Sequence, residues 1–134
     1  FRVDGTLWHR TGDAGRLDGE GRLWLLGRCV NRIDDAAGTL YPGTVEAALS
    51  FLPDVRRGAF LIHEGARWVV VAAHQRAQRL RAPDVQRAVS WAFPRGLIQV
   101  EEIPLDARHN AKVDYAALHR SLEARRWLRR EPAD

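Results

Sequence analysis

The chain has 134 residues, of which 46% are hydrophobic and 28% are charged, a composition typical of one small globular domain and not of a disordered tail. No apolar run approaches the roughly 20 residues that a membrane-spanning helix needs, so we expect no membrane span. The single cysteine, Cys29, excludes an internal disulfide and a zinc site built from several cysteines. It also favours a cytoplasmic location, where thiols stay reduced.

The net charge of +4 and the pI of about 10.2 raise the question of a nucleic-acid partner. The arginines are spread along the chain among acidic residues, and only residues 125–130 (RRWLRR) form a basic cluster. We interpret this cluster as the solvated end of a helix, and we expect no nucleic-acid partner. The sequence has no methionine and opens at Phe1 within strand-like sequence, so we interpret it as a piece of a longer protein.

The first 28 residues predict a small antiparallel unit. Residues 6–9 alternate in the manner of a strand, and residues 11–13 form a polar turn. Residues 18–21 (DGEG) are a strong hairpin signal, because their glycines stand where positive φ angles are needed. Residues 22–26 are the expected returning strand.

The remainder, residues 29–134, predicts an α+β domain with a three-stranded sheet flanked by helices. We expect one helix to begin at an N-cap Thr44, a second near Pro83 and a third at an N-cap Asp114. Apolar residues at helical spacing extend the second helix to Phe93. The predicted strands of the sheet cover residues 55–62, 67–73 and 97–100, and a short additional strand covers residues 32–34.

Two polar side chains of the first unit are candidates for ligand binding. Asp13 can complete its turn by bonding to its own backbone, but a carboxylate only accepts hydrogen bonds and can take both hydroxyls of a ribose. Arg28, at the end of the returning strand, can reach the same nucleotide, or it can form a surface ion pair of little energetic value.

Lys112 is the single lysine among 21 lysines and arginines. An exposed lysine near the start of a helix is its simplest explanation, and genome composition can account for the bias toward arginine. A compact ammonium can, however, act as a point charge in a tight site where a planar guanidinium cannot. Composition alone leaves both explanations of Lys112 open, and its candidacy as the catalytic residue depends on the resemblance described next.

Four blocks of the sequence resemble the adenylate-forming superfamily, which contains acyl-CoA synthetases, luciferases and peptide-synthetase adenylation domains. The blocks are residues 8–13 (WHRTGD), 21–28 (GRLWLLGR), 42–46 (PGTVE) and 112–114 (KVD). Together they cover the chain from residue 6 to about residue 122. Three stretches resemble one branch, the β-lactone synthetases of bacterial long-chain olefin synthesis: residues 27–32 (GRCVNR), 38–42 (GTLYP) and 108–112 (RHNAK).

The resemblance implies that residues 1–28 are the last hairpin of a larger N-terminal domain and that residues 29–134 are a mobile C-terminal domain. The N-terminal domain would be the partner of the C-terminal one, and it would bind ATP, Mg²⁺ and a carboxylic acid. Asp13 would hold the ribose hydroxyls, with Arg28 nearby. Lys112 would bridge the substrate carboxylate and the α-phosphate.

The same resemblance places the hinge between the two domains at Cys29 and Val30, where relatives carry an acidic or basic residue. Arg32 and His109 are candidate supporting residues. Packing of a loop histidine on the domain explains His109 equally well. No metal ligand is expected within this chain.

The expected function is activation of a carboxylic acid as an acyl-adenylate, followed by closure of a β-hydroxy fatty acid to a β-lactone. An acyl-CoA or other acid–thiol ligase is the alternative among enzymes. The use of CoA stays open, because residues 34–37 (DDAA) match the glycine-rich thioester-forming segment poorly. A detached interaction module that binds a partner through its basic tail is the alternative outside enzymes. We expect the 134 residues alone to be inactive.

Overall fold

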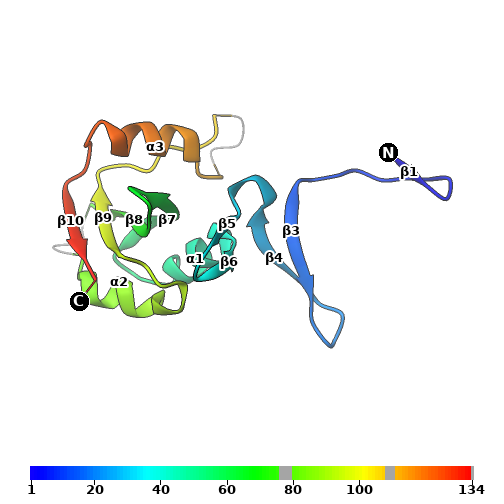
Figure 1. The fold of residues 1–134 in the computed structure, drawn as a ribbon, viewed down its shortest axis with the longest axis horizontal. Helices are drawn as coiled ribbons and strands as arrows, with labels where there is room; N and C mark the ends of the chain where they lie inside the picture. The colour runs from blue at the N-terminus through cyan, green and yellow to red at the C-terminus, as the bar shows by residue number, and fades with distance from the viewer. Residues whose placement is uncertain (76–79, 108–110, 134) are drawn as a thin grey trace.

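The computed structural model describes residues 1–75, 80–107 and 111–133, and it has the predicted α+β architecture (Figure 1). Its strands are β1 (Arg2–Val3), β2 (Thr6–Leu7), β3 (Asp13–Leu17), β4 (Leu23–Arg28), β5 (Ile33–Asp35), β6 (Gly38–Leu40), β7 (Val55–His63), β8 (Ala66–Ala73), β9 (Gly96–Val100) and β10 (Arg129–Pro132). Its helices are α1 (Pro42–Leu49), α2 (Ala82–Ala88) and α3 (Tyr115–Glu123), with short 3₁₀ turns η1 (Cys29–Asn31) and η2 (Ser90–Ala92). Within these described ranges, no helix is long and apolar enough to cross a membrane.

A mixed four-stranded sheet with the order β10-β9-β8-β7 forms the centre of the domain. β7 and β8 make an antiparallel hairpin, β9 runs parallel to β8, and β10 runs antiparallel to β9. The three predicted strands of the sheet are confirmed as β7, β8 and β9. The fourth strand, β10, was not predicted.

The basic cluster at residues 125–130 leads into β10, so its interpretation as a solvated helix end was wrong. α3 ends at Glu123, and Arg125 takes a φ of 53°, which turns the chain back toward the sheet. Arg130 then pairs with Ile98 of β9, and its guanidinium lies 4.3 Å from the centre of the Trp68 ring. A strand partner was available for this segment because β9 has a free edge on the side away from β8.

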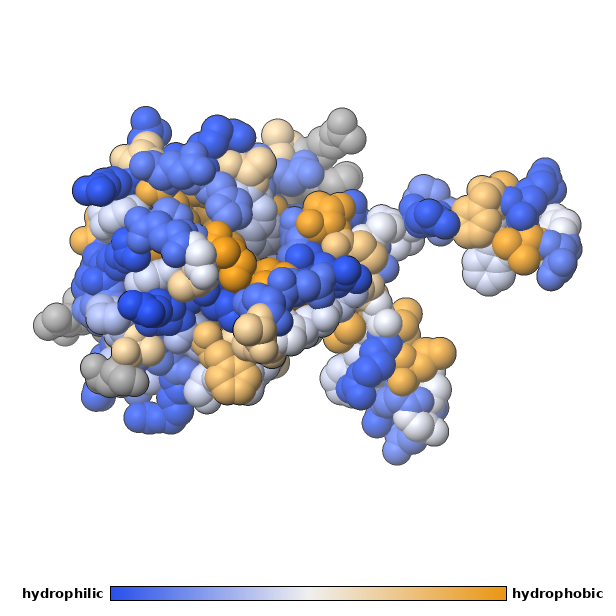
Figure 2. Space-filling view, in the orientation of Figure 1, coloured by the Kyte–Doolittle hydropathy of each residue, from blue (hydrophilic) through white to orange (hydrophobic). Residues whose placement is uncertain are grey.

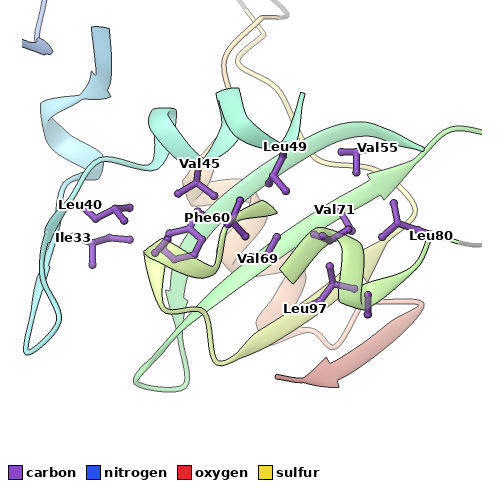
Figure 3. Close-up of a cluster of buried hydrophobic side chains, with 14 residues drawn as sticks. Ile33, Leu40, Val45, Leu49, Val55, Phe60, Val69, Val71, Leu80 and Leu97 are labelled. Atoms are coloured by element: carbon purple, nitrogen blue, oxygen red, sulfur yellow. The ribbon is translucent and has the colours of Figure 1, made fainter. Parts of the chain in front are cut away.

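Helices cover both faces of the sheet, because its strands carry apolar side chains on both sides. On one face, Phe60 and Val71 pack with Val45 and Leu49 of α1 and with residues of α2 (Figure 3). On the other face, the side chains that alternate with these belong to the cluster that contains Leu118 and Leu122 of α3. The domain therefore has three layers, with the sheet in the middle.

The beginning of α1 differs from the prediction, whereas that of α3 confirms it. Pro42 occupies the first turn of α1, where its fixed φ suits the helix. Thr44 is therefore inside the helix and is not its N-cap; its hydroxyl donates to the carbonyl of Tyr41 at 2.8 Å. The carboxylate of Asp114 accepts a hydrogen bond from the backbone N–H of Ala117 at 2.9 Å, as an N-cap does.

α2 is shorter than the apolar pattern predicted. It ends at Ala88 and is followed by η2, and Phe93 is 68% exposed instead of buried. Phe93 has φ 53° and ψ 53°, a left-handed conformation. Pro94 follows, and its ring disfavours the right-handed helical conformation in Phe93, so the helix does not continue through that residue.

The β5–β6 hairpin is fixed to the sheet by a buried arginine. Arg67, on β8, is 5% exposed, and it donates to both carboxylate oxygens of Asp35 at 2.7 Å. It also donates to the carbonyls of Gly38 and Ala92, at 2.7 Å and 3.0 Å. This arrangement confirms the short strand predicted near residues 32–34 and shows why it stays in place.

The predicted N-terminal hairpin is present as β3 and β4, and it projects from the three-layered body (Figures 1 and 2). The first predicted strand is shorter than residues 6–9, because only Thr6–Leu7 pair, with β1. Large apolar side chains of the β3–β4 hairpin face solvent; Leu17, Leu23 and Leu25 are 66%, 64% and 72% exposed.

Candidate active site

A pocket lies where the β3–β4 hairpin meets the three-layered body. Four parts of the chain line it: the hairpin (Asp13, Leu25, Gly27, Arg28), η1 (Asn31), the beginning of α1 (Pro42, Gly43, Glu46), and the first residue of α3 with the segment before it (Lys112, Val113, Tyr115). The three residues that the sequence singled out for catalysis and nucleotide binding, Asp13, Arg28 and Lys112, thus line one cavity.

Two cations converge on one oxygen of Asp13. Arg28 Nη1 donates to Asp13 Oδ1 at 3.1 Å and also to the carbonyl of Thr11 at 3.1 Å. Lys112 Nζ lies 3.8 Å from the same Oδ1. The Lys112 side chain is 53% exposed, against 29% for Asp13, so the ammonium stands at the open side of the pocket and the carboxylate lies deeper.

The charge of Asp13 is stabilised by these neighbours. Partial burial acts to raise the pKa of Asp13, but the hydrogen bond from Arg28, the positive charge of Lys112 and a hydrogen bond from Thr11 lower it, and the pKa lies below its ordinary value. Asp13 is therefore ionised at neutral pH. An ionised carboxylate is an acceptor for hydroxyl groups and a partner for cations.

The hairpin register explains why Arg28 faces Asp13. The two residues are direct partners in the β3–β4 pairing, and side chains opposite each other on an antiparallel pair are close enough to interact. Gly12, with a φ of 77°, makes the tight turn before β3, and its carbonyl accepts from the N–H of Cys29 at 2.9 Å. The turn and the pairing together fix both residues at one end of the hairpin.

Backbone contact also joins the hairpin to α1. A side-chain carbon added to Gly43 would lie 2.7 Å from the carbonyl oxygen of Leu26, closer than packed atoms can approach. Gly27, opposite, has a φ of 136° that other residues rarely adopt. Two glycines therefore allow the hairpin that carries Arg28 to lie directly against the beginning of α1.

The segment that carries Lys112 is held by its own short pairing. The carbonyl of Lys112 accepts from the N–H of Asp106 at 2.8 Å, and Leu105 and Val113 form an antiparallel bridge. The N–H of Asp114 donates to the carbonyl of Pro104 at 2.9 Å. Lys112 thus sits between this pairing and the N-cap of α3, a defined position for an exposed side chain.

Sequence reasoning missed two ionisable residues of this pocket, Glu46 and Tyr115. The hydroxyl of Tyr115 donates to Glu46 Oε1 and accepts from the N–H of Phe60 at 3.3 Å. Burial raises the pKa of the Glu46 carboxyl above its ordinary value, against the opposing effects of Tyr115 and Arg57. Burial, with the nearby Glu46, raises the pKa of Tyr115 well above its usual range. Glu46 stands in one of the sequence blocks described above, and that was its one available signal.

The remaining predicted residues lie elsewhere. Arg32 does not line the pocket; its Nε donates to Asp34 at 2.7 Å. Cys29 and Val30 stand in η1, immediately after the hairpin, and both are exposed, Val30 by 82%. Their role as a hinge stays a prediction. His109 lies outside the described residues.

Among curated proteins, the chain is similar to bacterial ligases and synthetases. It is 33% identical over 125 residues to the olefin β-lactone synthetase of Xanthomonas campestris, covering 78% of this chain and 21% of the relative. It is 30% identical over 116 residues to the indoleacetate–CoA ligase of Aromatoleum aromaticum, covering 80% and 23%. The chain thus spans between a fifth and a quarter of the length of these relatives. No family model matches the sequence.

Solved structures share the fold. Coronafacic acid ligase from Pectobacterium brasiliense superposes with a TM-score of 0.76 at 17% identity, covering 98% of this chain and 27% of that chain. ATP-bound MatB from Rhodopseudomonas palustris superposes with a TM-score of 0.66 at 21% identity, covering 84% and 24%. At these identities the similarity concerns the fold, and it extends over both the hairpin and the three-layered body.

Proposed function

We propose that this chain is the C-terminal part of a member of the adenylate-forming superfamily, an ATP-dependent enzyme that activates a carboxylic acid as an acyl-adenylate, and the similarity to a β-lactone synthetase and a CoA ligase supports the proposal. The observation that carries the proposal is the convergence of Lys112 and Arg28 on Asp13 in one pocket. A carboxylate and two cations at the contact of two structural units are suited to a substrate that has both hydroxyl groups and anionic oxygens.

Lys112 would act on the chemical step. A carboxylate oxygen of the acid attacks the α-phosphorus of ATP, and the bond to pyrophosphate breaks with its electron pair leaving on pyrophosphate. Two anions must approach each other, and negative charge spreads over the phosphate oxygens in the transition state. A positioned ammonium offsets this repulsion and stabilises the developing charge.

The position of Lys112 would allow its ammonium to move from Asp13 to the substrate anions. Its Nζ is 3.8 Å from Asp13 Oδ1, beyond hydrogen-bond distance, and its side chain is 53% exposed. A long, exposed ion pair contributes little free energy. Lys112 can therefore leave Asp13 for the substrate anions at small cost, while Arg28 remains hydrogen-bonded to Asp13.

Asp13 would hold the ribose of ATP. Its lowered pKa keeps it an acceptor at neutral pH, and a carboxylate can receive both hydroxyls of a ribose. Magnesium would accompany ATP in the larger N-terminal domain. In the part of the chain that the structure describes, no group of three or more His, Cys, Asp or Glu side chains is arranged to hold a metal ion.

We propose further that residues 1–28 are the last hairpin of this N-terminal domain, and that Cys29 and Val30 form the hinge. Three exposed apolar side chains of the β3–β4 hairpin support this assignment: Leu17, Leu23 and Leu25. Such an exposed apolar surface is typical of a contact with another domain. The chain matches 21% and 23% of the length of two relatives, so each relative has enough further sequence for a larger domain.

For the second step, we favour closure of a β-hydroxy acid to a β-lactone, supported by the similarity to olefin β-lactone synthetases. The oxygen of the β-hydroxyl attacks the acyl carbonyl, AMP leaves with its electron pair, and the hydroxyl proton passes to solvent. An acid–thiol ligase is the second candidate, favoured by the similarity to CoA ligases. In that reaction a thiolate attacks the same carbonyl, and AMP again leaves with its electron pair.

The experiment is to measure pyrophosphate release by the longer protein that contains this chain, with a β-hydroxy fatty acid and with the plain acid, both without CoA. Turnover of the β-hydroxy acid with release of a lactone supports the proposal. Release of AMP that occurs only after a thiol is added supports the second candidate. Lys112→Ala is expected to lower the rate roughly 10²- to 10³-fold. Arg16→Ala, on the exposed part of the hairpin, is the matched control, and equal rates for both variants would contradict the role of Lys112.

A further inference from the structure

Glu46 lies at a junction of three elements beside the pocket. It belongs to α1, and it accepts a hydrogen bond from the hydroxyl of Tyr115, the first residue of α3. The same hydroxyl accepts from the backbone N–H of Phe60 on β7 at 3.3 Å. The hydroxyl of Tyr115 therefore uses both its donor and its acceptor capacity, and it ties the start of α3 to the sheet and to α1.

A second connection reaches the other side of Lys112. Arg57, on β7, donates from Nη1 to the carbonyl of Ala111 at 3.3 Å. The positive charge of Arg57 also acts on the carboxylate of Glu46 and opposes the rise of its pKa. Ala111 directly precedes Lys112 and Tyr115 follows it by three positions, so a hydrogen bond from β7 or to α1 holds the chain on each side of the lysine.

From this arrangement we propose that Glu46 is a positioning residue for Lys112, which acts through its hydrogen bond with Tyr115 at the beginning of α3. The inference rests on the proposed function, because it concerns the group that stabilises the adenylation transition state. Glu46 and Tyr115 also line the pocket that Lys112 and Asp13 share. A displacement of the Glu46–Tyr115 pair is thus transmitted directly to the segment that carries the ammonium.

The polar nature of the junction supports a role beyond packing. The Glu46 carboxyl is partly buried, and burial of a carboxyl group costs free energy unless it is well paired. An apolar residue of similar size could fill the same space between α1 and α3. An apolar residue would not fix the orientation of the Tyr115 side chain. The hydrogen bond between phenol and carboxylate does, and it thereby sets the position of the first residue of α3. A reacting group displaced by about 1 Å can lose on the order of 10² in rate.

The kinetic test is a double-mutant cycle on pyrophosphate release by the longer protein that contains this chain. Tyr115→Phe removes the hydroxyl and keeps the ring, and Glu46→Leu removes the acceptor and keeps the bulk. Each is expected to lower the rate roughly 10- to 100-fold in the presence of Lys112 and to have no further effect in a Lys112→Ala background. Glu46→Gln, which retains an acceptor for Tyr115, is expected to lose less than Glu46→Leu.

The opposite results would overturn the inference. A variant that merely folds less well lowers the rate by the same factor in both backgrounds, and a residue that plays no part leaves both rates unchanged. Tyr41→Phe is the control, because it removes the hydroxyl of the second tyrosine of the chain, which does not line the pocket. If the unmodified protein and Lys112→Ala release pyrophosphate equally, the proposed function fails, and the following measurement decides on positioning alone.

That measurement uses the 134-residue chain itself. Because Lys112 is its single lysine, selective labelling with ¹⁵N-lysine gives one backbone amide signal in an NMR spectrum. Tyr115→Phe and Glu46→Leu are expected to shift or broaden that signal, and Tyr41→Phe to leave it in place. An unmoved signal in both pocket variants would show that the pair does not position Lys112, whatever reaction the protein catalyses.

Discussion

The ammonium nitrogen of Lys112 lies 3.8 Å from a carboxylate oxygen of Asp13, although the two residues stand near opposite ends of the chain. One belongs to the hairpin and the other to the segment before α3, so the contact exists because the hairpin packs against α1 through Gly27 and Gly43. Any change that moves the hairpin relative to the body also separates the two charges.

Asp13→Asn should weaken the use of ATP. The amide keeps the shape of the side chain but has no charge to hold Arg28 and Lys112, and it offers one acceptor oxygen instead of two. Loss of a hydrogen bond to a charged group corresponds to roughly 10- to 100-fold in binding, so the KM for ATP in pyrophosphate release by the longer protein should rise by that order. Asp4→Asn, in the exposed turn between β1 and β2, is the control, and an unchanged KM for Asp13→Asn would argue against ribose binding.

Gly43→Ala should destabilise the chain and Gly19→Ala should not. The new carbon at Gly43 would meet the backbone oxygen of Leu26, whereas at Gly19 it would meet no atom within 4 Å. Overpacking of this kind typically costs about 1–3 kcal/mol. Urea unfolding of the two variants measures the difference, and equal midpoints would mean that α1 and the hairpin are not in contact in solution.

The hairpin tip should respond to acid in a characteristic range. The indole N–H of Trp24 and the guanidinium of Arg22 both donate to Asp18, and together they lower its pKa to about 2 from an ordinary 3.8. Because the folded pKa lies below the unfolded one, the stabilisation is complete above about 3.8 and is lost as pH falls through about 2. The NMR signal of the Trp24 indole N–H should therefore titrate with a midpoint near pH 2 and not near 4, and Asp18→Asn should abolish the titration.

Leu49→Ala should lower the stability of the chain much more than Phe51→Ala, although both residues lie near the end of α1. Leu49 is fully buried against the sheet, and its truncation should lower the free energy of unfolding by roughly 2–5 kcal/mol. Phe51 is 86% exposed, and its truncation should change stability by no more than about 0.5 kcal/mol. Chemical denaturation of the 134-residue chain tests both, and a large effect at Phe51 would show that it has a partner within the chain.

Local signals in the sequence were sufficient for most of the fold. The glycines of residues 18–21 predicted the β3–β4 turn, the apolar run Trp68–Ala73 predicted a buried strand, and Asp114 predicted the beginning of α3. Each depends on residues next to one another in the chain. Thr44 failed as an N-cap because Pro42 had already started the helix, a competition between two neighbouring signals that the pattern alone does not rank.

What the sequence could not supply were contacts between distant segments. β10 exists because β9 offers it an edge, and nothing in its arginine-rich sequence indicates a strand. The pairing of Glu46 with Tyr115 joins helices that are far apart in the chain, so neither residue stood out among candidate site residues. Asp13, Arg28 and Lys112 were named through a family resemblance, and it is the fold that places them in one pocket.

The outer edge of β9 stays unpaired during synthesis, because its partner strand β10 comes later in the chain. β9 is synthesised well before β10, and until residues 129–132 leave the ribosome its outer edge presents unpaired backbone groups. Such an edge is a template for pairing with other chains. The arginines of β10, one stacked on Trp68, then close that edge with a charged strand. Removal of residues 129–132 would reopen that edge, so β10 shields backbone groups at which another chain could otherwise pair.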